Sequence, residues 1–310
     1  MFKDSQPVLT VSNLTKIYGA YTAVDGISFT VPKGCIIGLL GPNGAGKTTT
    51  IQMLIGITRP NGGTITYFDM DFAHHKHECL QRINFASSFN TLQGRIAVEE
   101  NLRVFSDLYG VRNATSKIAE LSELLEITNL LKMKYWDLSK GQQTRVNIVK
   151  ALLNDPELLL FDEPTASLDP DIADKLLSLI ERMRTERKLS ILYTSHDMAE
   201  VTRICDEVIF LDHGTIAAQD SPLNLTQKIE HARLSISFGG ERKKIEAILQ
   251  KYSERISFPF SHTVHAEVKQ KEIPAILACI NTAGALIEDI SIEKPTLDDV
   301  FMHIARGTYF

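Results

Sequence analysis

Eight consecutive residues near the N-terminal end have the spacing of a phosphate-binding loop. They match the pattern G-x-x-x-x-G-K-[ST] in the order Gly41, Pro42, Asn43, Gly44, Ala45, Gly46, Lys47, Thr48. Glycines let backbone N–H groups curl around phosphate oxygens, and a helix beginning at the loop adds the positive end of its dipole. The lysine reaches the outer phosphates, and the Thr48 hydroxyl can ligate Mg²⁺. We therefore expect a nucleotide site here, to which Thr49 also contributes.

Two carboxylates follow a second apolar run further along the chain. Asp162 stands at the end of the run 158–161, and Glu163 comes next. A carboxylate at the end of a buried strand can reach the Mg²⁺ held by Thr48, which is the role we expect of Asp162. Glu163 is placed to polarise a water in line with the γ-phosphate. The alternative is that the two acids only cap a strand before Pro164, and the phosphate-binding loop disfavours it.

The elements that must position these residues alternate between strands and helices. Apolar runs predict strands over 8–12, 27–31, 35–40, 64–67, 158–161, 191–194 and 208–211. Fully apolar runs are typical of a central parallel sheet. A helix over 172–187 separates two of the strands, and helical periodicity extends from Val98 to Leu153. This alternation predicts an α/β P-loop NTPase domain with an inserted helical subdomain at about 89–157.

The pattern changes after Asp220-Ser221-Pro222, which we interpret as a boundary between domains 1–222 and 223–310. Beyond it we expect strands over 233–238, 255–259, 264–269 and 287–293 and helices over 242–252, 273–282 and 296–305. The order βαββαβ predicts a small α+β domain of the ferredoxin-like kind. No residue pattern in this region points to a chemistry.

Composition limits the function classes. The chain of 310 residues is 44% hydrophobic and 23% charged, which is ordinary for a soluble globular protein. A net charge of −5 argues against nucleic acid as a partner. The four cysteines are far apart and predict neither a disulfide framework nor a zinc site. We expect no signal peptide and no membrane span, so any spans must come from another chain.

Four potential soft-metal ligands lie close together at His74, His75, His77 and Cys79. They fall on an expected surface loop or helix start, and no acidic or second histidine pair completes a site. We therefore expect an ordinary surface segment there.

From residue 8 to about 220 the chain resembles the ATP-binding subunits of ABC transporters. Leu138-Ser139-Lys140-Gly141-Gln142 stands where that family has its LSGGQ signature, and Ser167-Leu168-Asp169 matches its D-loop. His196 matches the switch histidine, and Tyr18 falls where the family places an aromatic ring against adenine. The C-terminal region looks like the accessory domain of subunits that serve ABC-2-type exporters.

The resemblance implies ATP hydrolysis with ATP and Mg²⁺ bound, Glu163 as general base, and assistance from His196 and Lys47. It adds residues outside the loop to the nucleotide site: Tyr18, Ser139, Gly141, Gln142 and Asp169. In the family two nucleotide-binding subunits, identical or different, hold two ATP molecules head to tail, and the signature of each faces the γ-phosphate held by the other. The implied partners are membrane permease subunits on separate chains. The implied location is the cytoplasm, at the inner face of the cell membrane, and the implied process is export.

Two positions depart from the family pattern. Counting back from Val98, the family's lid glutamine falls near Ser88, whose hydroxyl has a shorter reach toward Mg²⁺ and the attacking water. Gln93 lies five positions later, and its use would require a shift of the loop. Lys140 replaces the usual second glycine of the signature, which is tolerable if its side chain points outward. We expect slower hydrolysis rather than its loss.

Two other functions explain less of the sequence. Soluble ABC ATPases of translation carry two cassettes, and those of DNA repair insert long coiled coils between loop and signature. This chain has one phosphate loop, and about 90 residues separate it from the signature. A catalytically weakened, nucleotide-binding regulatory subunit is supported by Ser88 alone.

Overall fold

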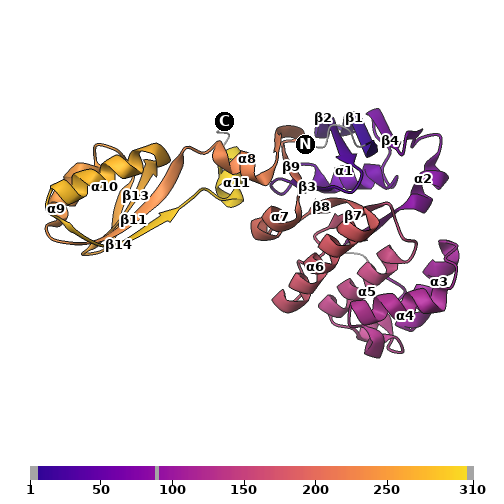
Figure 1. Ribbon diagram of the computed structural model, residues 1–310. Helices are drawn as coiled ribbons and strands as arrows, with labels where there is room; N and C mark the ends of the chain where they lie inside the picture. The colour runs from indigo at the N-terminus through magenta and orange to yellow at the C-terminus, as the bar shows by residue number, and fades with distance from the viewer. Residues whose placement is uncertain (1–5, 88–90, 306–310) are drawn as a thin grey trace. The chain divides into compact units, whose positions relative to one another are not determined.

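The computed structural model describes residues 6–87 and 91–305, and Figure 1 shows its helices and strands. Contacts between residues divide the chain into two compact units, Met1–Pro222 and Leu223–Phe310. Within the described ranges, none of the helices combines the length and the apolar character that a membrane crossing requires.

A six-stranded sheet forms the centre of the larger unit. Its strand order is β10-β9-β3-β8-β7-β6. The strands are β10 (Thr215–Asp220), β9 (Glu207–Asp212), β3 (Ile36–Leu40), β8 (Ser190–Thr194), β7 (Leu158–Asp162) and β6 (Ile83–Ser87). All neighbours are parallel except β10, which pairs antiparallel with β9. Parallel strands end at one edge of a sheet, where α/β proteins bind their ligands. The phosphate-binding loop and both candidate carboxylates follow or end such strands.

A second, antiparallel sheet has the order β2-β1-β4-β5. It consists of β2 (Tyr21–Pro32), β1 (Pro7–Tyr18), β4 (Gly62–Tyr67) and β5 (Met70–Asp71). The first two strands are longer than the predicted runs 8–12 and 27–31, because they continue as a hairpin with half-exposed residues. In that hairpin Tyr18 lies opposite Tyr21. Side chains of directly opposite residues share one face of a sheet.

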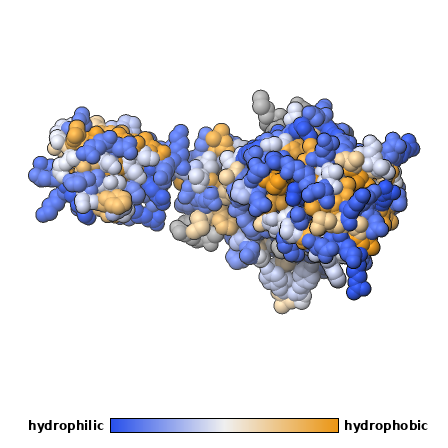
Figure 2. Space-filling model, turned by 90° about the horizontal axis from the view of Figure 1, so that it is seen from below, coloured by the Kyte–Doolittle hydropathy of each residue, from blue (hydrophilic) through white to orange (hydrophobic). Residues whose placement is uncertain are grey.

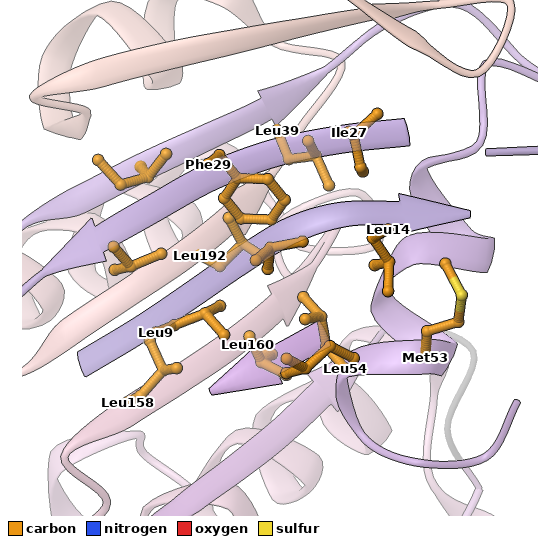
Figure 3. Close-up of a cluster of buried hydrophobic side chains, with 14 of the residues drawn as sticks. Leu9, Leu14, Ile27, Phe29, Leu39, Met53, Leu54, Leu158, Leu160 and Leu192 are labelled. Atoms are coloured by element: carbon orange, nitrogen blue, oxygen red, sulfur yellow. The ribbon is translucent and has the colours of Figure 1, made fainter. Parts of the chain in front are cut away.

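The core of this unit lies between the two sheets and α1 (Lys47–Leu54). Figure 3 shows Leu9 and Phe29 of the antiparallel sheet near Leu39 and Leu192 of the parallel sheet, with Leu54 of α1 among them. Each fully buried side chain of this size contributes about 1.5–3 kcal/mol. The strands that carry the site residues are therefore fixed on both faces by apolar packing.

A group of helices lies between β6 and β7 in the sequence and forms its own part of the larger unit (Figure 1). It contains α3 (Val98–Leu108), α4 (Ala114–Leu124), the 3₁₀ turns Thr128–Leu130 and Tyr135–Asp137, and α5 (Lys140–Leu152). Three further helices are α2 (Lys76–Arg82), α6 (Pro170–Arg187) and α7 (Met198–Ile204); the last two connect strands of the parallel sheet.

The segment before α3 and the 3₁₀ turn before α5 are held side by side. The backbone N–H of Trp136 donates to the Gly94 carbonyl at 3.1 Å, and the backbone N–H of Tyr135 donates to the Ile96 carbonyl at 3.2 Å. A Cβ atom added at Gly94 would lie 2.0 Å from the indole nitrogen of Trp136, so the ring rests directly on the glycine backbone. The segment after residues 88–90 is thus fixed to the segment that precedes Ser139.

The smaller unit contains an antiparallel sheet of order β12-β13-β11-β14. Its elements follow the order β11 (His231–Gly239), α9 (Arg242–Leu249), β12 (Ile256–Phe260), β13 (Thr263–Lys269), α10 (Ile273–Thr282) and β14 (Leu286–Glu293), which is the expected βαββαβ succession. The helices α8 (Pro222–Gln227) and α11 (Leu297–Ala305) flank it in sequence. Alternate residues of β11 are buried, so one face of the sheet packs on an apolar core.

Hydrophilic residues predominate on the face shown in Figure 2, with hydrophobic ones interspersed in both units. Phe260 and Leu286 of the smaller unit are among the exposed large hydrophobic residues.

Candidate active site

The phosphate-binding loop connects β3 to α1, and its glycines are required by the backbone. Gly41 and Gly46 have φ angles of 146° and 102°, which side chains other than glycine rarely tolerate. A Cβ atom at Gly41 would lie 2.2 Å from the carbonyl oxygen of Leu211, and one at Gly46 would lie 2.5 Å from that of Ala23. The loop therefore packs against its neighbours through bare backbone.

Lys47 is buried within this loop, at the first position of α1. Its ammonium donates to the carbonyls of Gly41 at 2.5 Å and Pro42 at 3.1 Å. Burial lowers the pKa of Lys47, and the nearby charges of Glu163 and Asp162 act in the opposite direction. A desolvated cation beside backbone N–H groups fits an anionic phosphate chain.

A cavity of about 200 Å³ opens at the loop. It brings together most of the predicted loop residues and the predicted base: Pro42, Asn43, Gly44, Gly46, Lys47, Thr48, Thr49 and Glu163, with Tyr21 and Ala23. Gly41 and Ala45 are buried and support the loop from behind, where the Gly214 N–H donates to the Ala45 carbonyl at 3.2 Å. A hydroxyl and a carboxylate facing one cavity beside a lysine fit an oxygen-ligated Mg²⁺ and a phosphate chain.

Thr194 organises both candidate carboxylates, and sequence analysis did not identify it. Its hydroxyl donates to Asp162 Oδ1 at 2.8 Å and accepts the Glu163 N–H at 3.1 Å. The Glu163 N–H also donates to the Thr194 carbonyl at 3.1 Å. Asp162 is thereby held at the end of β7, and the chain turns at Glu163.

Glu163 adopts a left-handed backbone conformation, with φ of 53°. That conformation costs a non-glycine residue roughly 1–2 kcal/mol. Its Oε1 atom lies 2.6 Å from Nε2 of His196, the residue predicted as the switch histidine. Strained residues cluster at functional sites, and here the strain turns a carboxylate toward a histidine beside the phosphate loop.

The signature residues lie in a different part of the larger unit. Ser139 caps the N-terminus of α5: its Oγ accepts the Gln142 N–H at 3.3 Å, and Gln142 Oε1 accepts the Ser139 N–H at 2.9 Å. Lys140 is exposed, as its replacement of glycine requires. A Cβ atom at Gly141 would lie 2.9 Å from the carbonyl oxygen of Ser167, so this glycine allows the D-loop to approach. None of these residues lines the cavity at the phosphate loop.

Asp169 and Tyr18 also lie outside that cavity lining. Asp169 is exposed and precedes α6. Tyr18 is exposed, and the Lys16 ammonium lies 4.9 Å from its ring centroid. Tyr21, which does line the cavity, donates its hydroxyl to the Gly44 carbonyl at 3.1 Å. The hairpin register that places the two tyrosines opposite each other is the signal that sequence analysis did not use.

The two lid candidates have different outcomes. Ser88 lies outside the described residues. Gln93 is held by α3 through its backbone, because the buried Asn101 side chain accepts the Gln93 N–H at 3.0 Å and donates to the Gln93 carbonyl at 2.9 Å. Gln93 therefore belongs to the helical part of the unit.

The histidines that precede and begin α2 pair with nearby carboxylates. His74 Nδ1 lies 2.7 Å from Asp71 Oδ1, and His75 Nδ1 lies 2.8 Å from Glu78 Oε2. Across the residues that the structure describes, no three His, Cys, Asp or Glu side chains gather in a way that could hold a metal ion.

Comparisons with known proteins agree with this geometry. A family model described as ABC transporter matches residues 24–166. The Nod factor export ATP-binding protein I of Rhizobium sp. (strain N33) is 32% identical over 312 residues, which cover 97% of this chain and 97% of that protein. The protein of the same name from Ralstonia nicotianae is 36% identical over 258 residues, covering 81% of this chain and 79% of that protein.

A solved structure of an ATP-binding subunit of an ABC transporter superposes with a TM-score of 0.67 at 28% identity, over 71% of this chain and 92% of its own. The Rhizobium relative matches nearly end to end, and the phosphate loop, the two carboxylates and the histidine occur in one fold. The chain therefore belongs to the ATP-binding subunits of ABC transporters, and it is an ATPase.

Proposed function

We propose that the chain hydrolyses ATP at the cavity formed by residues 42–49, with Glu163 as the general base. The observation that carries this proposal is the position of Glu163: it lines the same cavity as Lys47 and Thr48 and contacts His196 at 2.6 Å. A base so placed can accept a proton from a water that attacks the γ-phosphate. The histidine orients the carboxylate and stabilises charge beside it.

The remaining residues of the site bind the phosphates and Mg²⁺ and take no part in proton transfer. Lys47 and the backbone N–H groups of the loop hold the phosphates, and α1 directs its N-terminus toward them. Thr48 and Asp162 are the residues that would hold Mg²⁺. Thr48 presents a hydroxyl oxygen in the first turn of α1, and Asp162 presents a carboxylate oxygen at the end of β7. The ion supplies neutralisation of the phosphate charge.

The signature completes the site from a second subunit. In the capping arrangement the Ser139 oxygen accepts a backbone N–H, so its hydroxyl proton remains to be donated outward. The N-terminus of α5 adds the positive end of a helix dipole beside it. We propose that this end of α5 binds the γ-phosphate held by the partner subunit in a head-to-tail dimer.

The chain energises export in this proposal. The support is that relatives matching 97% and 81% of the chain are named for Nod factor export, and the first match includes the smaller unit. Permease subunits on separate chains would supply the membrane spans, and the protein would work at the cytoplasmic face of the membrane. A catalytically weakened, nucleotide-binding regulatory subunit is the alternative, and an intact set of base, lysine and histidine disfavours it.

The test is Glu163→Gln, which removes the base and keeps the size of the side chain. We expect kcat for ATP hydrolysis to fall by roughly 10²-fold to 10⁴-fold with ATP affinity retained. The matched control is Glu157→Gln, next to the other end of β7, where Glu157 pairs with Arg82 on the surface at 2.7 Å. That control should retain wild-type turnover. Wild-type turnover in Glu163→Gln would refute the assignment of the base.

A further inference from the structure

The contact between Glu163 and His196 depends on two separate loops. Glu163 follows β7, whereas His196 lies between β8 and α7. The side chain of His196 is 57% exposed. The side chain of Glu163 is only 17% exposed, so the pair meets solvent on the histidine side, and it must be held in one geometry against the entropy of its side chains. Other contacts must therefore hold the two loops at a constant distance.

Glu200, on α7, contacts both loops through a single oxygen. Its Oε2 atom accepts the hydroxyl of Thr165 at 2.8 Å, two residues after Glu163. The same atom accepts the hydroxyl of Ser195 at 2.9 Å, one residue before His196.

A third hydroxyl reaches that oxygen from the parallel sheet. Tyr193, near the end of β8, donates to Glu200 Oε2 at 2.8 Å. The network thus joins the sheet, the loop of Glu163 and the loop of His196.

The three donors are all buried, so each depends on Glu200 Oε2 as its hydrogen-bond acceptor in place of water. Thr165 and Ser195 are less than a tenth exposed, and Tyr193 is fully buried. A buried hydroxyl that loses its acceptor costs about 1–3 kcal/mol. Burial, followed by the charge of Glu200, raises the pKa of Tyr193, so this phenol stays a neutral donor. Hydroxyl groups bind an ionised carboxylate more strongly than a neutral oxygen.

We propose that Glu200 is a positioning residue for ATP hydrolysis, which fixes the distance between Glu163 and His196 by holding the hydroxyls of Thr165 and Ser195 on one oxygen. This inference rests on the proposed role of Glu163. Glu200 does not react; it keeps the base and the histidine in register while the loops around them exchange nucleotide. The Asp197 N–H, which donates to the Ser195 oxygen at 3.0 Å, extends the same arrangement along the histidine loop.

The first experiment is steady-state ATP hydrolysis by Glu200→Gln in the full chain. The amide is neutral, so its oxygen accepts the three hydroxyls less strongly than the carboxylate does, and its NH2 group adds a competing donor beside them. We expect kcat to fall by about 10-fold to 100-fold, the range that a small misplacement of reacting groups produces. The KM for ATP should change by less than about twofold, because the phosphate loop is untouched. A raised KM for ATP with an unchanged kcat would overturn the proposal.

A matched control loosens α7 without touching the network. Glu181 of α6 pairs with Arg203 of α7 at 3.0 Å. Glu181→Gln removes this surface pair and should leave kcat within about twofold of the wild type. A loss as large as that of Glu200→Gln would show that any weakening of α7 reduces turnover, and would overturn the specific role of Glu200.

Single hydroxyl deletions keep the proposal testable if Glu200→Gln does not fold. Thr165→Val and Ser195→Ala each release one loop and should lower kcat. Tyr193→Phe removes the donor on the rigid sheet, so it should lower the melting temperature and retain kcat. Equal kcat losses from all three would indicate a structural network only.

A double-mutant cycle separates positioning from stability. In a His196→Ala background, Glu200→Gln should reduce kcat by less than about twofold further, because one of the two groups whose distance Glu200 fixes is already absent. A double variant whose reduction in kcat equals the product of the two single reductions would overturn the proposal. The two proposals fail separately: wild-type turnover of Glu163→Gln refutes the proposed base, whereas an inactive Glu163→Gln beside a fully active Glu200→Gln refutes only the positioning role.

Discussion

The two halves of the candidate site are built by different physical means. The phosphate half depends on the parallel sheet: the loop follows β3, and Asp162 and Thr194 end buried strands. The signature half depends on one helix terminus, where Ser139 and Gln142 cap each other. The first half is fixed by apolar packing on both faces of a sheet, and the second by two hydrogen bonds at an exposed end.

In the head-to-tail dimer that we propose, the two halves of one chain act on different nucleotides. The cavity at the loop contains the lysine, the threonine hydroxyl and the base, but no residue of 139–142. The signature serine and helix end nevertheless have the chemistry of an anion site. The phosphate half should therefore determine affinity within one subunit, and the signature half should determine turnover between subunits.

The largest effect should come from disabling each half and then mixing the two variants. Lys47→Ala removes a charge-assisted donor and should weaken ATP binding by roughly 10-fold to 100-fold. Ser139→Arg places a bulky cation at the helix end and should abolish turnover with ATP affinity retained in the monomer. In a mixture, one composite site contains an intact loop and an intact signature, so part of the ATPase activity should return.

Titration of one variant against the other measures this recovery. With ATP held near the wild-type dissociation constant, where Lys47→Ala binds little nucleotide, the recovered activity should rise to a maximum near equal concentrations of the two variants. Either variant alone should show little activity at every protein concentration. Full activity of Ser139→Arg by itself would contradict the division between the two halves.

A smaller effect concerns the connection between the halves. Lys150 of the signature helix α5 is buried and donates to the Phe85 carbonyl at 3.0 Å, on the strand β6. Burial lowers the pKa of Lys150 from 10.5 to about 8. Between pH 8 and pH 10.5 the unfolded chain binds more protons at this residue than the folded chain. The contribution of Lys150 to the free energy of unfolding should therefore rise with pH in that window and be constant below it.

Urea denaturation of the wild type and of Lys150→Met at pH 7.0 and about pH 9.5 tests this linkage. The wild type should gain roughly 2 kcal/mol relative to the variant between the two pH values. A difference that is independent of pH would show that the lysine is not desolvated, and that α5 and β6 are joined in some other way.

The smallest effect is expected at Gln93. Its backbone N–H and carbonyl form the hydrogen bonds with the Asn101 side chain. Gln93→Ala should change kcat by less than about twofold, whereas Asn101→Ala, which leaves buried backbone groups without partners, should lower the melting temperature. A severe hydrolysis defect in Gln93→Ala would instead make Gln93 the lid residue and attach the lid to the signature half.

Sequence alone predicted the parts of the fold that strong periodicity marks. The apolar runs at 158–161 and 191–194 correspond to β7 and β8, and the long helix α6 was expected. The strand β6 was missed because polar Asn84 and Ser87 interrupt its pattern, and α7 because seven residues give too short a period. Hydrophobic periodicity does not mark these two elements. They form because the strand is buried within the sheet and the helix packs against a face of the sheet.

For the candidate site, the motifs predicted most of the residues that line the cavity at the loop, but neither Tyr21, which also lines it, nor the residues that hold the carboxylates and their loops. Tyr21, Thr194 and Glu200 are ordinary residue types with no distinctive spacing. Each acts through hydrogen bonds to segments distant in sequence, such as the 2.8 Å bond from Thr165 to Glu200 across 35 positions. Such contacts follow from strand order, which a single sequence does not reveal.

The contact of Trp136 with Gly94 gives the protein an optical reporter of its own. Trp136 is the only tryptophan in the sequence, and its ring is exposed beside the guanidinium of Arg95. It stands three positions before Ser139 and rests on the backbone of Gly94. Its emission therefore reports, without any label, on the environment of the signature half, and a blue shift and loss of quenching on addition of ATP would record the moment at which a second subunit covers that surface.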